Sequence, residues 1–125
     1  MTARNGGRWT EARYRQFVIS ALRGAFRRWP PKFDVLKNAF TEQRINAATG
    51  RRANHYKCAE CSNDFPLRGV QVDHIHPVVD PKKGFIDWGT FIDRLYVEGK
   101  KLQVLCTGCH KVKSAEERKE RGTKK

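Results

Sequence analysis

Residues 102–113 read LQVLCTGCHKVK, and residues 58–61 read CAEC. Each stretch holds two cysteines separated by two residues, a spacing that lets both thiolates reach one metal ion from a single turn. Two such pairs complete a tetrahedral set of sulfur ligands, which predicts a structural Zn²⁺ site. Redox-active pairs, disulfide bonds and unligated thiols are the alternatives. The four predicted ligands are Cys58, Cys61, Cys106 and Cys109.

Between the cysteine pairs, residues 72–77 read VDHIHP. If all four cysteines bind one ion, the segments that follow the two pairs become neighbours, and Asp73 and His74 come near His110. A carboxylate and an imidazole suit one divalent ion. A second imidazole that binds no metal suits a general base, because its pKa lies near neutrality. The set indicates metal-assisted hydrolysis; the alternative is an ordinary exposed Asp-His pair.

The remaining sequence predicts a mixture of short helices and strands, which is the α+β class. Apolar residues recur at helical spacing from Tyr14 to Trp29, after the candidate N-cap residue Thr10. Two prolines at 30 and 31 are expected to end this helix, and a second short helix is expected to begin near Asp34. The other expected elements are strands at 70–73 and 102–105, helices at 87–96 and about 110–121, and a loop at 46–54.

The chain of 125 residues carries 26 basic and 13 acidic side chains, a net charge of +13. The excess is uneven, because residues 1–57 hold 13 basic and 3 acidic residues, whereas residues 58–125 hold 13 basic and 10 acidic residues. Such an excess indicates a polyanionic partner, with nucleic acid ahead of an anionic membrane surface or an acidic protein. We therefore expect a basic helical extension at 1–54 and a zinc-braced domain at 55–125.

The basic face of the first helix is the candidate for nucleic-acid contact outside the cysteine-containing part. Three of its arginines are predicted to contact phosphates without reading sequence, which adds salt-sensitive affinity. A solvated face of an amphipathic helix is the alternative. The three arginines are Arg23, Arg27 and Arg28.

The sequence has no apolar run of about 18 residues and no secretory signal core. We therefore expect no membrane partner and a cytoplasmic location. In that compartment the cysteines are expected to be reduced, which favours metal binding over disulfides.

Residues 58–114 resemble the HNH endonucleases of the zinc-braced kind. The resemblance rests on the order of the first CxxC pair, the stretch VDHIHP at 72–77 and the stretch LQVLCTGCHKVK at 102–113. The N-terminal part more loosely resembles the small free-standing HNH proteins of tailed phages. The family implies a ββα-metal (His-Me) finger, with two strands and a helix around one catalytic ion.

Carried over position by position, the resemblance implies a metal-dependent DNA endonuclease that nicks or cuts both strands. His74 would be the general base, and Asp73 and His110 would bind a catalytic divalent ion, which is Mg²⁺, Mn²⁺ or Ni²⁺. The four cysteines would bind a separate structural Zn²⁺. Lys113 and Lys101 are predicted to contact nucleic acid.

One position departs from the family pattern. The family's asparagine, five residues before the third cysteine, is Lys101 here. A lysine cannot accept a hydrogen bond, and Gln103 is the nearest amide that could substitute. Two alternatives therefore stay open: a weak or inactive HNH scaffold that binds nucleic acid, and an adaptor in phage assembly or packaging. A protein partner or a homodimer also stays open.

Overall fold

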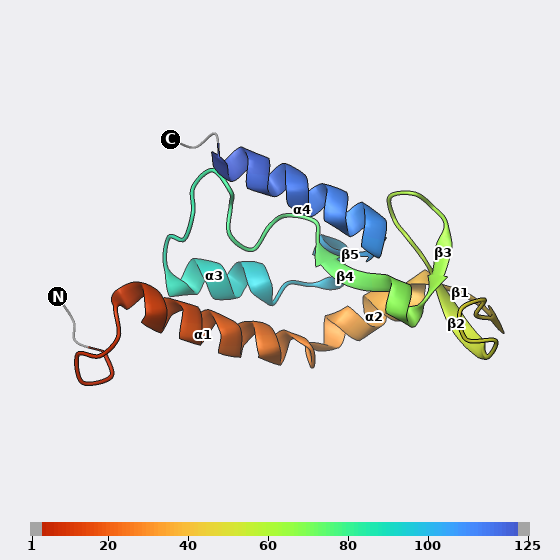
Figure 1. Ribbon diagram of the computed structural model, residues 1–125, viewed down its shortest axis with the longest axis horizontal. Coiled ribbons are helices and arrows are strands. Elements are labelled where there is room, and N and C mark those ends of the chain that lie inside the picture. The colour runs from red at the N-terminus through yellow and green to blue at the C-terminus, as the bar shows by residue number, and fades with distance from the viewer. Residues whose placement is uncertain (1–3, 123–125) are drawn as a thin grey trace.

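A computed structural model describes residues 4–122 of the chain as a mixture of helices and small sheets (Figure 1). The predicted mixture of helix and sheet is therefore confirmed. The elements are α1 (Glu11–Phe26), α2 (Pro30–Ala39), β1 (Phe40–Ile45), β2 (Arg52–Lys57), β3 (Asp64–Pro66), β4 (Val70–His74), α3 (Trp88–Leu95), β5 (Leu102–Cys106) and α4 (Thr107–Gly122), with 3-10 turns at Leu67–Gly69 and Gly99–Lys101.

Helix α1 begins where the sequence predicts. The hydroxyl of Thr10 accepts a hydrogen bond from the Arg13 backbone N–H at 3.1 Å, which satisfies one free donor of the first turn. The start near Asp34 predicted for the next helix is wrong, because α2 begins at Pro30. A proline has no N–H and a fixed φ, so it fits the first turn of a helix, where the N–H has no partner within the helix.

The first sheet has the strand order β1-β2-β3, and both pairs are antiparallel. The loop predicted at 46–54 is only partly confirmed. Residues 46–51 form the turn, closed by a hydrogen bond from the Asn46 N–H to the Arg51 carbonyl at 2.8 Å. Strand β2 begins at Arg52. Most side chains of β1 and β2 are exposed, whereas His55 is buried.

The second sheet pairs β4 with β5, and both strands lie where the sequence predicts strands. The strands are antiparallel, with Asp73 opposite Gln103 and His74 opposite Leu102. Helix α4 follows β5 directly and packs on this sheet, and α2 packs on it from the other side (Figure 1). The end of β4 therefore lies next to the first turns of α4.

Two small groups of buried residues form the core. One contains Cys58, Leu105 and Cys106, and the other contains Val78, Phe91 and Leu95. The apolar face of α1 packs against the second group through its middle and last turns. The cysteine cluster is therefore part of one of the two cores.

The predicted boundary between residues 54 and 55 lies inside strand β2. Strand β1, on its N-terminal side, pairs with β2 along the whole hairpin. The division into 1–54 and 55–125 stays a prediction, and its outermost residues, 1–3 and 123–125, lie outside the described part. Among the described residues, no helix combines the length and the apolar character needed to cross a bilayer.

Candidate functional site

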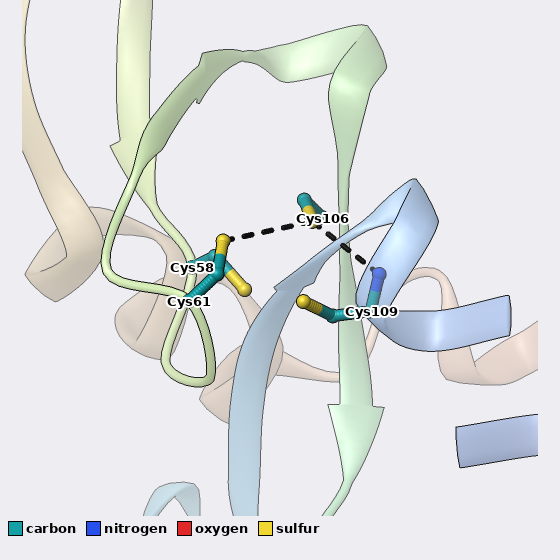
Figure 2. Close-up of side chains that lie close together, drawn as sticks. All are labelled: Cys58, Cys61, Cys106 and Cys109. Atoms are coloured by element: carbon teal, nitrogen blue, oxygen red, sulfur yellow. Dashed lines mark hydrogen bonds between the residues drawn. The ribbon is translucent and has the colours of Figure 1, made fainter. Parts of the chain in front are cut away.

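The four predicted zinc ligands lie together (Figure 2). Cys58 and Cys61 come from the turn after β2, and Cys106 and Cys109 come from the junction of β5 with α4. All four sulfur atoms lie within 4.8 Å of one another. Zn–S bonds of about 2.3 Å place tetrahedral sulfurs about 3.8 Å apart, and the Cys61 and Cys106 sulfurs are 3.9 Å apart. The cluster therefore fits a metal ion such as zinc.

Backbone hydrogen bonds hold the first cysteine pair against β5. The Ala59 N–H donates to the Val104 carbonyl at 2.8 Å, which fixes the turn to the strand that carries Cys106. The turn itself closes with a hydrogen bond of 3.0 Å from the Ser62 N–H to the Cys58 carbonyl. Ser62 has a φ of 64°, the left-handed conformation that reverses the chain here. The polypeptide therefore assembles the ligands itself.

The thiols differ in how readily they ionise. Burial raises the pKa of Cys58, but backbone N–H groups of Cys61, Cys106 and Glu60 outweigh it and lower the pKa to about 6. Contact with the Cys106 thiol, together with burial, raises the pKa of Cys109 to about 12. The Cys58 thiol therefore ionises easily. The Cys109 thiol resists ionisation because the other cysteine sulfurs lie next to it. A divalent cation supplies the charge that lets all four ionise together.

Asp73 lies on the side of β4 that faces α4. Its Oδ1 is 3.6 Å from His110 Nε2. Its Oδ2 accepts hydrogen bonds from Lys113 Nζ at 2.7 Å and from Gln103 Nε2 at 3.2 Å. The structure therefore brings together Asp73 and His110, the two residues predicted to bind a catalytic ion. Within residues 4–122, only the cysteine cluster gathers three or more side chains that could hold a metal ion.

His74, the next residue, faces the opposite side of the strand. Its ring packs against the ring of Phe26 in a tilted arrangement, with centroids 4.8 Å apart, and its Nε2 lies 2.7 Å from the Leu95 carbonyl oxygen. Because a carbonyl only accepts, Nε2 carries the proton and Nδ1 has the lone pair. Burial lowers the pKa of His74, and the Leu95 carbonyl partly opposes this shift. The imidazole is therefore neutral at pH 7, the form that a general base requires.

A pocket of about 340 Å³ adjoins His74. Nε of Arg94 donates to the Pro77 carbonyl at 3.0 Å, which fixes this side chain at the pocket wall. Lys101 lies in the same wall, and its carbonyl accepts the Ile75 N–H at 2.9 Å. The six lining residues are His74, His76, Asp93, Arg94, Val97 and Lys101.

Of the predicted nucleic-acid contacts, Lys101 lines this pocket, and the charge of Arg23 contributes to the lowered pKa of His74. Arg23 is exposed on the last turn of α1, and Arg27 and Arg28 are exposed just after this helix ends. Arg23 lies with its guanidinium 5.7 Å from the centre of the Phe91 ring, and Nε of Arg27 donates to the Gly24 carbonyl at 3.2 Å. Their contact with nucleic acid stays a prediction.

Sequence reasoning missed two neighbours of His74: the ring of Phe26 and the backbone carbonyl of Leu95. The apolar spacing of α1 includes Phe26 but does not show which face of the sheet it meets. A backbone carbonyl has no sequence signature at all.

Comparison of the chain with family models, with curated proteins and with solved structures gave no match. What the chain does is therefore inferred from its own side chains.

Proposed function

We propose that the chain is a metal-dependent DNA endonuclease of the HNH kind, with a ββα-metal finger formed by β4, β5 and α4. One observation carries the proposal. Asp73 meets His110 on one side of β4 at 3.6 Å, while the adjacent His74 keeps a neutral imidazole beside a pocket on the other side. A pair of metal ligands next to a general base is the minimum equipment for hydrolysis of a phosphodiester.

His74 takes the proton of the attacking water at Nδ1. Its Nε2–H is already used by the Leu95 carbonyl, which holds the ring in the tautomer and orientation required. Asp73 and His110 would hold the divalent ion, which stabilises negative charge on the phosphate when bound.

The pocket beside His74 is proposed to bind DNA next to the scissile phosphate, which would lie at the end of β4 between this pocket and the pair of Asp73 and His110. Arg94 and Lys101 add positive charge to its wall, which favours an anionic group. Asp93 lies in the same wall and opposes part of that charge. The lysine at the family's asparagine position thereby gains a role in substrate binding.

Plasmid cleavage by the wild type and His74→Ala tests the proposal. Each protein is incubated with Mg²⁺, Mn²⁺ or Ni²⁺, and with EDTA as the control. We expect nicking or linearisation by the wild type and a loss of at least about 100-fold in His74→Ala, the usual contribution of a general base. Zinc content, and duplex binding without an added catalytic ion, should be the same in both proteins.

The specific observation behind a second candidate is Lys101, which puts a charge beside His74 where the family has an amide. This candidate is an HNH scaffold that binds nucleic acid without cutting it. It predicts no cleavage by the wild type with any ion, together with a retained gel shift. That result would overturn the endonuclease proposal.

A further inference from the structure

Lys113 is surrounded by oxygen atoms at the junction of β4 and α4. Its Nζ lies 2.7 Å from Asp73 Oδ2, 2.5 Å from the His74 carbonyl oxygen and 3.3 Å from Glu117 Oε2. An ammonium group has three N–H donors. The three oxygens therefore account for every donor of Lys113.

These contacts tie the lysine to the protein rather than to solvent. The side chain of Lys113 is 25% exposed and that of Asp73 only 13%. Moving the ammonium onto a phosphate would leave a largely buried carboxylate with less compensation, which is costly. A direct phosphate contact, the role that the family resemblance suggests for Lys113, conflicts with this arrangement.

The contacts also divide the two oxygens of Asp73 between different partners. Oδ2 is taken by Lys113 and by Gln103, whereas Oδ1 faces Nε2 of His110. Two donors on Oδ2 fix the orientation of the carboxylate group. Oδ1 is therefore held in one direction, toward His110. The bond to the His74 carbonyl fixes the main chain of the next residue in the same way.

We propose that Lys113 is a positioning residue. It sets the carboxylate of Asp73 and the main chain of His74 relative to α4, and it does not contact the DNA phosphate. The effect of Lys113 on cleavage rests on the proposed endonuclease function. Its positioning of Asp73 and His74 is independent of that function.

The first test compares Lys113→Met with Lys111→Met. Both remove one positive charge from the same helix, but Lys111 is exposed. We expect Lys113→Met to lower kcat at least tenfold, with KM, and duplex affinity without an added catalytic ion, within twofold of the wild type. We expect Lys111→Met to change kcat less than twofold.

The salt dependence of duplex binding separates positioning from phosphate contact. Each phosphate contact contributes about 0.9 to the slope of log K against log salt. The slope of Lys113→Met should equal that of the wild type. A slope shallower by about 1 would overturn the proposal, because it shows that Lys113 neutralises a phosphate.

A third readout needs no cleavage. Backbone amide resonances of residues 73–75 should move in Lys113→Met and stay in place in Lys111→Met. Unchanged resonances in Lys113→Met would overturn the positioning role, even if the wild type cleaves DNA. If instead the wild type does not cleave while these resonances move, the endonuclease proposal fails and the positioning role stands.

A measurement on the wild type covers the case in which Lys113→Met does not fold. The ¹⁵Nζ resonance of Lys113, assigned through its own side-chain carbons, is followed during titration with duplex DNA without an added catalytic ion. We expect this resonance to stay in place, because the ammonium keeps its three protein acceptors. A shift that tracks DNA binding would overturn the proposal.

Discussion

At the scale of single residues, the central fact is that two neighbours on β4 face different surroundings. Asp73 lies among the donors of α4 and β5, whereas the ring of His74 lies against Phe26 and the Leu95 carbonyl. Strand alternation places the two side chains on opposite faces of the sheet. Asp73 contacts the cationic and polar groups of α4 and β5, and His74 is kept neutral by burial.

The pKa of His74 leads to a prediction about pH. Burial lowers this pKa below its ordinary value, so the base stays deprotonated down to lower pH. Cleavage should therefore be lost, as pH falls, with a midpoint below about 6.5. Phe26→Leu removes part of the covering ring, so the pKa should rise toward its ordinary value and the acid limb should move to higher pH.

The measurement is the pH profile of single-turnover plasmid nicking for the two proteins, with thermal melting as a check on folding. An acid limb of Phe26→Leu at the same or a lower pH than that of the wild type would contradict the burial argument.

Much of the candidate site follows from short motifs. The spacing of the cysteines, the DH pair at 73–74 and the histidine after the last cysteine are all legible in the sequence. His110 and Lys113 are three residues apart on a helix, so they share a face. Two of the three acceptors around Lys113 could not be predicted, because one is a backbone carbonyl and the other depends on how β4 meets α4.

At the scale of elements, the sheet β1-β2-β3 shows where sequence patterns fail. The strands β4 and β5 alternate apolar and polar residues or are buried, and both were predicted. Strands β1 and β2 are mostly exposed and polar, so they carry no period-two signal. This three-stranded sheet is stabilised instead by polar contacts between residues that are distant in the sequence.

The clearest of these contacts joins β1 to β3. The guanidinium of Arg44 and the hydroxyl of Thr41 both donate to the carboxylate of Asp64. Arg44, with a smaller effect of Thr41, lowers the pKa of Asp64 to about 2. A depressed carboxyl pKa stabilises the fold above the ordinary value near 3.8, and this stabilisation is lost as pH falls toward 2.

Asp64→Asn should therefore unfold at a lower urea concentration than the wild type at pH 7. The gap between the two midpoints should be the same at pH 7 and pH 5, because Asp64 is ionised in both the folded and the unfolded chain at these values and thiolate-bound metal is retained. A midpoint of Asp64→Asn equal to that of the wild type at pH 7 would show that the ion pair does not stabilise this sheet.

At the scale of the whole molecule, the core is small and the cysteine cluster is part of it. Cys58 and Cys106 are among the few fully buried apolar residues of the described chain. A structural zinc contributes apparent binding energies of about 10–16 kcal/mol, as much as the whole stability of a small domain. Metal binding and folding should therefore be coupled.

Removal of the metal tests this coupling. The protein as purified should contain one zinc per chain, and a strong chelator should abolish cooperative thermal unfolding, which added Zn²⁺ should restore. Cys61→Ser, which alters the most exposed of the four ligands, should lower the melting temperature and weaken zinc retention. If the chelated protein melts at the same temperature as the untreated one, zinc does not stabilise the fold.

The net charge of +13 attracts DNA to the whole surface. A specific contact of the arginines at the end of α1 with DNA is therefore tested by comparing two variants that lose the same charge at different places. One variant replaces Arg23 in α1 and Arg27 and Arg28 just after it by alanine, and the other replaces Arg118, Lys119 and Arg121 at the end of α4. Each removes three positive charges from exposed positions, so a general loss of attraction affects both equally. Each phosphate contact contributes about 0.9 to the slope of log K against log salt for duplex binding. If the three arginines of the first variant contact phosphates, this slope should be shallower by about 2 to 3 in that variant only. Equal slopes in the two variants would mean that α1 contributes charge to the molecule but no contact to DNA.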